Sequence, residues 1–194
     1  MTQAIIFTPA ARDAQANFRE ALDCLSRPGT LGKLAPAAFP LPGARAAYAL
    51  LLALADQEVS IAVLGGDEPL ARFASLGTGA RLAEPATAWY VLCLADPGQQ
   101  LAELRRGTDE FPEDGATAIV CVERLGEGAL SLSLRGPGIR QDTQLRLSGL
   151  SHDAIRARNT ACGQYPLGID LFLVDADGRV AGIPRTTRIT VEGQ

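Results

Sequence analysis

Length, composition and charge narrow the function classes open to this chain. It has 194 residues, 47% of them hydrophobic, so we expect a single domain over residues 1–194 whose core needs no disulfide or metal. A net charge of −4 at pH 7, without any run of lysines or arginines, argues against nucleic acid or an anionic membrane as a partner.

The first predicted element is a helix that begins at Pro9 behind a Thr8 cap, because apolar residues then recur at helical spacing. It ends in the sequence Ser26-Arg27-Pro28-Gly29, where proline cannot continue the hydrogen-bond ladder and glycine permits a sharp exit. Arg27 at this end most simply satisfies the terminal carbonyls and the helix dipole. An extended segment over residues 30–34 is expected next.

The middle of the chain alternates predicted helices and strands. Residues 44–55 are apolar nearly all round, which indicates a buried helix. The following elements are a strand at 59–64, a helix at 68–76, a strand at 88–94 and a short helix at 99–106. The polar stretch 107–115 is too broken for a helix or strand and predicts an exposed loop of the kind that often has a function.

A hairpin is predicted after this loop, with strands at 116–122 and 129–134 around the turn at 126–128. The sequence Gly136-Pro137-Gly138 ends it abruptly, and a last helix at 152–159 follows with Ser151 as its cap. Strands and helices interleave throughout, with antiparallel hairpins late in the chain. The predicted fold is therefore α/β, a three-layer α/β/α sandwich on a mixed sheet.

The C-terminal region predicts a second hairpin. Two apolar segments, 169–174 and 180–183, flank an Asp-Ala-Asp-Gly sequence with turn chemistry. A loop of two or four residues would place Asp170 opposite Ile183 and diagonally from Arg185. A loop of three residues would shift the register by one and move every side chain to the other face.

Both faces of this hairpin are apolar, which is typical of strands covered on both sides. The expected faces are Phe172, Val174 and Ile183 on one side, and Ile169, Leu171, Leu173 and Val180 on the other. A carboxylate in such a place is costly unless it is paired, so Asp170 needs a cation, and Arg185 is the nearest in the expected register. Two interpretations remain open: a structural ion pair, or a pair that also orients an anionic ligand.

Residues that ligate metals or act as nucleophiles are sparse. His152 is the only histidine, and the four cysteines stand far apart, so we expect no metal site and assign no catalytic residue. Cys93 and Cys121 fall in apolar strand-like stretches, where reduced thiols favour an intracellular compartment. The longest apolar run is too short to span a bilayer, and the first residues lack a charged leader pattern. We therefore expect a cytoplasmic protein.

Several glycine turns stand beside arginines and threonines. Backbone amides at such turns and guanidinium groups hold oxyanions well if they converge, which the sequence does not reveal. Lys33 is the only lysine and is not part of a Walker motif, so a nucleotide P-loop is rejected. The candidate ligand-binding residues are Arg27, Gly29, Gly136, Gly138, Asp170, Arg185, Thr186 and Thr187.

A set of short motifs spans nearly the whole chain. They are Ser26-Arg27-Pro28-Gly29, residues 50–56, Gly107-Thr108, Gly136-Pro137-Gly138, Tyr165-Pro166-Leu167-Gly168-Ile169-Asp170 and Ile183-Pro184-Arg185-Thr186-Thr187. In this order they resemble the H subunit of the bacterial carbon–phosphorus lyase core complex, and the last two are the most specific. Tyr165 replaces the phenylalanine usual before Pro166, and Arg135 stands where a small polar residue is common.

The resemblance implies phosphonate catabolism in a multi-subunit transferase, with the G, I, J and L subunits as partners. The H, G, I and L subunits would form alpha-D-ribose 1-methylphosphonate 5-triphosphate from ATP and methylphosphonate, and a radical enzyme on J would then break the C–P bond. The resemblance also implies a homodimer and a fold similar to a reduced large domain of PLP-dependent transferases. No cofactor is expected, because no lysine stands near the late strands to form a Schiff base with PLP.

Two roles within such a complex remain open. The leading hypothesis is an accessory, structural dimer that docks on the I subunit, with the isolated chain inactive. The alternative is a direct binding pocket for a phosphonate or ribose phosphate, built from Arg27, the Gly136–Gly138 turn and Arg185. An independent enzyme would require turnover by the chain alone.

Overall fold

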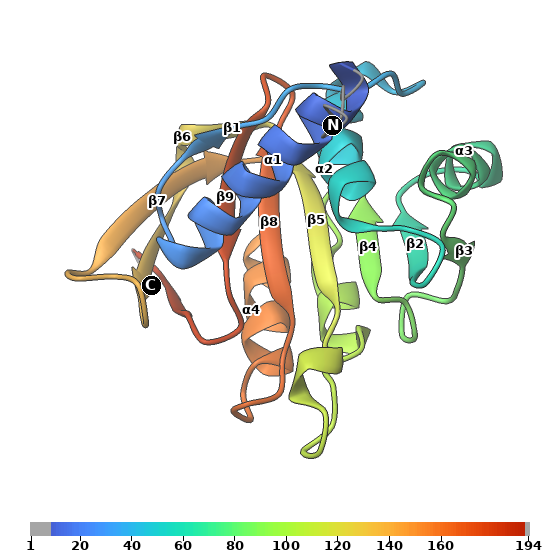
Figure 1. Ribbon diagram of the computed structural model, residues 1–194. Helices are drawn as coiled ribbons and strands as arrows, with labels where there is room; N and C mark the ends of the chain where they lie inside the picture. Colours follow the sequence, from blue (N-terminus) through green and yellow to red (C-terminus); the bar gives the residue numbers. More distant parts are fainter. Residues whose placement is uncertain (1–8, 193–194) are drawn as a thin grey trace, which may run out of the picture.

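The frame of the structure, a computed structural model that describes residues 9–192, is a seven-stranded mixed sheet beside a smaller antiparallel sheet (Figure 1). In chain order the elements are α1 (Pro9–Ser26), β1 (Gly32–Lys33), η1 (Pro42–Ala44), α2 (Arg45–Leu54), β2 (Ser60–Leu64), α3 (Glu68–Thr78), β3 (Arg81–Leu82), β4 (Tyr90–Cys93), η2 (Gly98–Glu103), η3 (Pro112–Asp114), β5 (Thr117–Val122), β6 (Arg124–Arg135), β7 (Thr143–Ser148), α4 (His152–Ala161), β8 (Asp170–Asp175), β9 (Arg179–Ile183) and β10 (Arg188–Val191). The prediction of an α/β fold on a mixed sheet is confirmed.

The large sheet has the order β1-β9-β8-β5-β4-β2-β3. Its central strands β2, β4, β5 and β8 run parallel, whereas β9 pairs antiparallel with β8 and β1 with β9. The central strands are almost continuously apolar and buried, as expected when both faces of a sheet are covered. Asp170, the first residue of β8, therefore lies at the end of this buried parallel layer where its strands begin.

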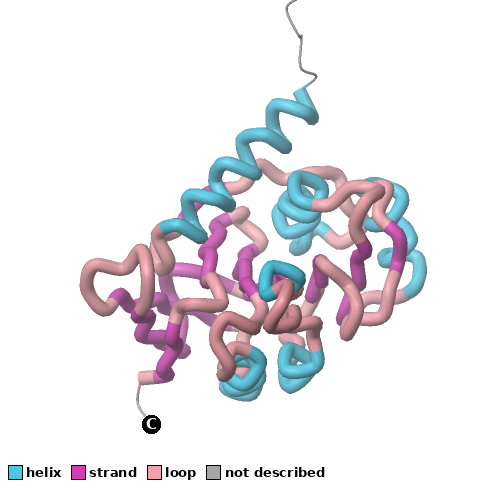
Figure 2. The backbone as a smooth tube through the Cα atoms, turned by 60° about the horizontal axis from the view of Figure 1, so that its bottom comes forward, coloured by secondary structure: helices cyan, strands magenta, loops and turns pink. Residues whose placement is uncertain are grey.

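Two hydrophobic clusters cover the two faces of the large sheet. On one face, α1, α2 and α3 pack over Ile119 and Phe172, and Leu51 of α2 belongs to the same cluster. On the other face, α4 and η2 pack over Leu171, and Leu101 of η2 belongs to that cluster. Figure 2 shows helices on both sides of the strands. The small sheet, β10-β6-β7, joins α4 in the second outer layer. This layer is therefore mixed and not helical alone as expected, and the likeness to a reduced PLP-dependent transferase domain stays a prediction.

The predicted hairpin between residues 116–122 and 129–134 is wrong. β5 lies in the large sheet between β4 and β8, whereas β6 pairs with β7 and β10 in the small sheet. The two strands differ in burial: β5 is buried on both faces, but β6 alternates between buried and exposed side chains, as in a sheet with one solvated face. The turn expected at 126–128 is an irregularity within β6, where its register with β7 shifts.

The register predicted for the C-terminal hairpin is also wrong by one residue. Leu171 faces Ile183 and Val174 faces Val180, so the connection is the three-residue type. The buried carboxylate of Asp175 explains it, because its oxygens accept hydrogen bonds from the backbone N–H groups of Arg179 (2.9 Å) and Leu125 (3.2 Å). Gly178, at φ 86°, closes the turn in the left-handed region.

This slip exchanges two side chains between the faces. Ile183 joins Leu171 in the cluster under α4, and Val180 joins Phe172 in the cluster under α1 and α2. The expectation that both faces are covered is nevertheless confirmed, because each cluster contains residues of both strands.

Most predicted helices are confirmed, with shifts at their ends. α3 runs two residues further than expected and begins at an Asp67 cap, whose Oδ1 accepts from Leu70 N–H at 3.0 Å. α4 has the predicted Ser151 cap, which accepts from Ala154 N–H at 3.1 Å. The short helix expected at 99–106 is the 3₁₀ helix η2, and the Thr8 cap lies outside the described residues. Within residues 9–192, no helix combines the length and apolar character needed to cross a bilayer.

Candidate functional site

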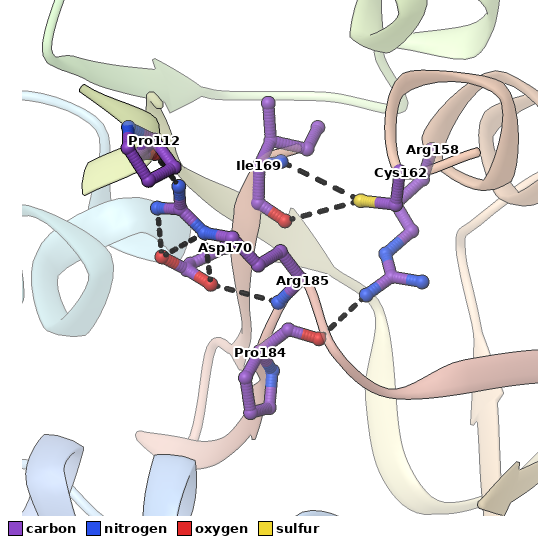
Figure 3. A network of polar contacts seen from close by, with 7 residues as sticks. All are labelled: Pro112, Arg158, Cys162, Ile169, Asp170, Pro184 and Arg185. Carbon is purple, nitrogen blue, oxygen red and sulfur yellow. Dashed lines mark hydrogen bonds and ion pairs between the residues drawn. The ribbon is translucent and has the colours of Figure 1, made fainter. Parts of the chain in front are cut away.

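Asp170 and Arg185 form the predicted ion pair at the start of β8 (Figure 3). Arg185 Nη2 lies 2.6 Å from Asp170 Oδ2, and Arg185 Nε lies 3.3 Å and 3.2 Å from Oδ1 and Oδ2. The backbone N–H of Arg185 also donates to Asp170 Oδ1 at 2.7 Å. The side chains are only 15% and 22% exposed, so the pair is shielded from solvent. A bidentate, shielded pair of this kind fixes geometry more firmly than an exposed one.

The pair forms although the register that predicted it is wrong. β9 ends at Ile183, and Arg185 lies two residues further along, where the alternation of a strand no longer sets the side-chain direction. A turn follows in which the N–H of Thr187 donates to the carbonyl of Pro184 at 2.9 Å. The chain thus leaves the sheet and turns Arg185 back onto Asp170.

Arg185 also holds the exposed stretch 107–115 that precedes β5. Its Nη1 donates to the carbonyl oxygen of Pro112. Gly115 packs so closely on this guanidinium that an added Cβ would lie 2.6 Å from Arg185 Nη1. The same guanidinium therefore joins β8, the segment after β9 and the loop before β5.

A second arginine, Arg158 of α4, reaches the same segment from the other side (Figure 3). It is 1% exposed, and its Nη1 and Nη2 donate to the carbonyl oxygens of Thr187 (2.7 Å) and Pro184 (2.6 Å). Burial lowers the pKa of Arg158 below its ordinary value, while the neighbouring Cys162 and Asp170 act in the opposite direction. Within residues 9–192 no carboxylate lies close enough to form an ion pair with it.

Arg158 is not among the residues predicted from the sequence, although its position on α4 carries a signal. It stands four residues after Ala154 and three before Ala161, and both alanines are buried on one face of α4. An arginine on the apolar face of a short helix must find partners in the interior, so this placement alone marks it as special.

A pocket of about 500 Å³ opens between α4 and the segment after β9. Its lining residues are Arg158, Asn159, Cys162, Gly163, Tyr165, Leu167, Arg185, Thr186, Thr187, Arg188, Ile189 and Thr190. The lining contains three arginines and no acidic side chain. Of the predicted candidates, Arg185, Thr186 and Thr187 line this pocket, and Asp170 holds Arg185 in place.

The candidate residues Gly29, Gly136 and Gly138 lie where two chain segments approach so closely that a side chain would not fit. A Cβ on Gly136 would lie 3.0 Å from the carbonyl oxygen of Thr186, and one on Gly138 would clash with the carbonyl oxygen of Ser26. A Cβ on Gly29 would lie 2.5 Å from Thr143 Cγ2. The Gly136–Gly138 turn therefore lies between the end of α1 and the Thr186 segment, but none of these glycines lines the pocket.

Arg27 lies apart from the pocket as well. Its guanidinium pairs with Asp23 one turn back on α1, and 58% of its side chain is exposed. The alternative pocket built from Arg27, the Gly136–Gly138 turn and Arg185 is thus replaced by a pocket around Arg158, Arg185 and Arg188.

The chemistry of this arrangement is electrostatic. Both oxygens of Asp170 and each nitrogen of the Arg185 guanidinium have partners within the fold, which leaves Asp170 poorly placed for proton transfer. In residues 9–192 no group of His, Cys, Asp and Glu side chains is arranged to hold a metal ion. The arginines concentrate positive charge beside a cavity, which suits the binding of an anion.

Comparison with known proteins relates this geometry to a function. A family described as bacterial phosphonate metabolism protein (PhnH) matches residues 6–190. HtxG of Stutzerimonas stutzeri, described as a candidate C-P lyase subunit, is 37% identical over 185 residues, which are 92% of this chain and 87% of the relative. The alpha-D-ribose 1-methylphosphonate 5-triphosphate synthase subunit PhnH of Rhizobium meliloti (strain 1021) is 33% identical over 195 residues, covering 96% of this chain and 94% of that subunit.

Proposed function

We propose that this chain, which belongs to the PhnH family of bacterial phosphonate metabolism proteins, is a subunit of a carbon–phosphorus lyase complex. One relative is named as a subunit of the synthase of alpha-D-ribose 1-methylphosphonate 5-triphosphate. We assign the same step to this chain: together with G, I and L subunits it helps to join methylphosphonate to the ribose of ATP.

Within the complex we propose an accessory role without catalysis by the isolated chain. The observation that carries this role is the Asp170–Arg185 pair, whose hydrogen-bonding groups are directed at the fold itself. Through Pro112 the pair fixes the exposed loop 107–115, where Phe111 is 49% exposed. A large apolar side chain on a loop held in one shape is suited to contact a partner subunit.

The proposal includes docking on the I subunit, further contacts with G, J and L, a homodimer and a cytoplasmic location. Several large apolar side chains are exposed and support protein contacts, among them Leu22 at 50% and Leu76 at 85%. All four cysteines are free thiols, which agrees with a reducing compartment.

The experiment is a copurification and growth test in a host that lacks its own H-type subunit. The chain should restore growth on methylphosphonate as sole phosphorus source and copurify with the partner subunits. Arg185→Ala and Asp170→Asn should both lower the copurified amount about tenfold or more, because either change releases the loop from β8.

Arg72→Ala is the matched control, since Arg72 forms an exposed ion pair with Glu68 on α3. It should leave assembly and growth unchanged. Circular dichroism of each variant checks that it is folded. Normal assembly together with full phosphonate turnover in both Arg185→Ala and Asp170→Asn would remove any role for the pair.

A second role, direct binding of a ligand, is favoured by a specific observation. Three arginines and no acidic residue line the 500 Å³ pocket between α4 and the segment after β9. This volume lies in the range of small-molecule sites, about 300–1,000 Å³. Binding and assembly are compatible, because the pocket and loop 107–115 both depend on Arg185.

A further inference from the structure

The pocket beside α4 has an excess of positive charge. Arg158, Arg185 and Arg188 line it, and Asp170 behind Arg185 offsets one of the three charges. The end of α4 also lies at the pocket, and its dipole is equivalent to about −0.5 of a charge. Three guanidinium groups outweigh both contributions, so a net positive charge above +1 remains.

Two buried polar atoms of the lining have no hydrogen-bond partner among the described residues. They are Nε of Arg158 and Oγ1 of Thr187. Buried polar groups are nearly always satisfied, and an unpaired one calls for an explanation such as a ligand or an ion. The buried guanidinium of Arg158 donates only to uncharged oxygens and forms no ion pair with a described carboxylate, so its desolvation is incompletely offset.

Arg188 differs from the other two arginines of the pocket because its guanidinium group is available to bind a ligand. It opens β10, is exposed, and forms no side-chain hydrogen bond or ion pair with another described residue. Arg185 is fixed by Asp170 and Pro112, yet a guanidinium has five N–H donors, so part of its donor capacity stays open. The pocket thus combines two fixed guanidinium groups with one free to close on a ligand.

We infer that this pocket binds the tetrahedral oxyanion of a phosphonate or phosphate group, held by Arg158, Arg188 and the Thr187 hydroxyl. Charge-assisted hydrogen bonds from arginine forks are the strongest that proteins offer to such a group. The cavity is larger than one oxyanion requires, so it also accommodates an organic substituent. The inference rests on the second role proposed above and adds the ligand class and the groups that hold it.

The test is calorimetry of the intact chain with inorganic phosphate, methylphosphonate and ATP, and with acetate as a planar comparator. We expect saturable binding of at least one phosphorus oxyanion and none of acetate at the same concentration. The most tightly bound probe identifies the source of the group. Arg188→Ala should weaken binding about tenfold, because it removes one charge-assisted contact.

Thr187→Val separates ligand binding from a structural role. Valine has the same shape and lacks the unpaired hydroxyl, so the fold should be as stable as before or more stable. Oxyanion binding should nevertheless fall several-fold. Arg81→Ala is the matched control, and this variant should bind the oxyanion normally. Arg81 is likewise an exposed arginine at the start of a strand, but it lies on β3, the edge strand of the large sheet at the end away from β9.

Two results would overturn the inference: no saturable binding of any phosphorus oxyanion at millimolar concentration, or binding that Arg188→Ala and Thr187→Val leave unchanged. Growth on methylphosphonate is scored in parallel. A chain that restores growth without binding an oxyanion would refute the pocket and leave the subunit assignment standing. A chain that binds an oxyanion but fails to restore growth would refute the subunit assignment and leave the pocket standing.

Discussion

At the scale of single residues, Arg158 is the least expected feature of this protein. The residue is 1% exposed, and its guanidinium group has no carboxylate partner among the described residues. It donates instead to the carbonyl oxygens of Thr187 and Pro184. These bonds attach α4 to the segment after β9, and the neighbouring Asn159 adds a third by donating to the carbonyl of Ile189 at 2.9 Å. Arg158 therefore shapes the pocket as well as lining it.

Removal of the Arg158 side chain should destabilise the protein strongly. We expect Arg158→Met to lower the free energy of unfolding by about 3 kcal/mol, because two buried carbonyl groups lose their donors. Urea denaturation followed by circular dichroism measures it. Arg156→Ala on the same helix is the control; its side chain is 63% exposed in a pair with Asp153, and its effect should be below about 0.5 kcal/mol.

A loss in Arg158→Met no larger than that in Arg156→Ala would show that the carbonyl contacts contribute little. The pocket would then owe its shape to the backbone packing of Gly136 against Thr186 instead.

At the scale of elements, one buried carboxylate decides how β8 and β9 pair. Asp175 is 1% exposed and holds the N–H groups of Arg179 and Leu125, which belong to β9 and β6. It thereby links the large sheet to the small one and selects the three-residue turn. A carboxylate at a turn is usually solvated, so the sequence pattern pointed to the commoner loop lengths.

Substitution of Asp175 should weaken this junction. In Asp175→Ala two buried N–H groups lose their acceptor, and we expect the free energy of unfolding to fall by about 2 kcal/mol. Urea denaturation at pH 7 is the measurement. Asp177→Ala in the same turn serves as the comparison, since its side chain is 58% exposed and its loss should be below about 0.5 kcal/mol. Equal losses in the two variants would contradict the assigned role.

At the scale of the whole molecule, buried thiols line the interior on both sides of the large sheet. Burial, followed by the charges of Glu20 and Asp23, raises the pKa of Cys24 to about 11 from an ordinary value of 9.0. Burial raises the pKa of Cys121 to about 12 and that of Cys93 still further. The folded state keeps these protons at a pH where the unfolded chain has released them, so the protein should be vulnerable to alkali.

The buried, protonated thiols contribute to the free energy of unfolding in a way that depends on pH. This contribution to stability is complete below about pH 9 and is lost as the pH rises from 9 towards 11 and 12. Urea midpoints at pH 8 and pH 10.5 should differ less in Cys24→Ala than in the unaltered chain. Val180→Ala, a truncation in the same cluster, should lower both midpoints and keep the difference. An unchanged difference in Cys24→Ala would contradict the assignment.

The sequence by itself determined the fold class, most of the helices and the family. These properties follow from local patterns: helical periodicity, caps, continuous apolar strands and short contiguous motifs. The sequence also predicted Arg185, Thr186 and Thr187 as site residues, but it did not predict the pocket that they line. The single-domain expectation stays a prediction.

Tertiary structure alone decided the partner of β6, the register of β9 and the partners of Arg158. β5 and β6 are neighbours in the chain but belong to different sheets. β5 is covered on both faces and β6 on one, and which faces of a strand are covered depends on how the layers pack together. The register depended on Asp175 reaching a backbone group fifty residues away in the chain. Contacts between distant segments of this kind leave no local pattern, so the convergence of three arginines on one pocket became visible only in the folded chain.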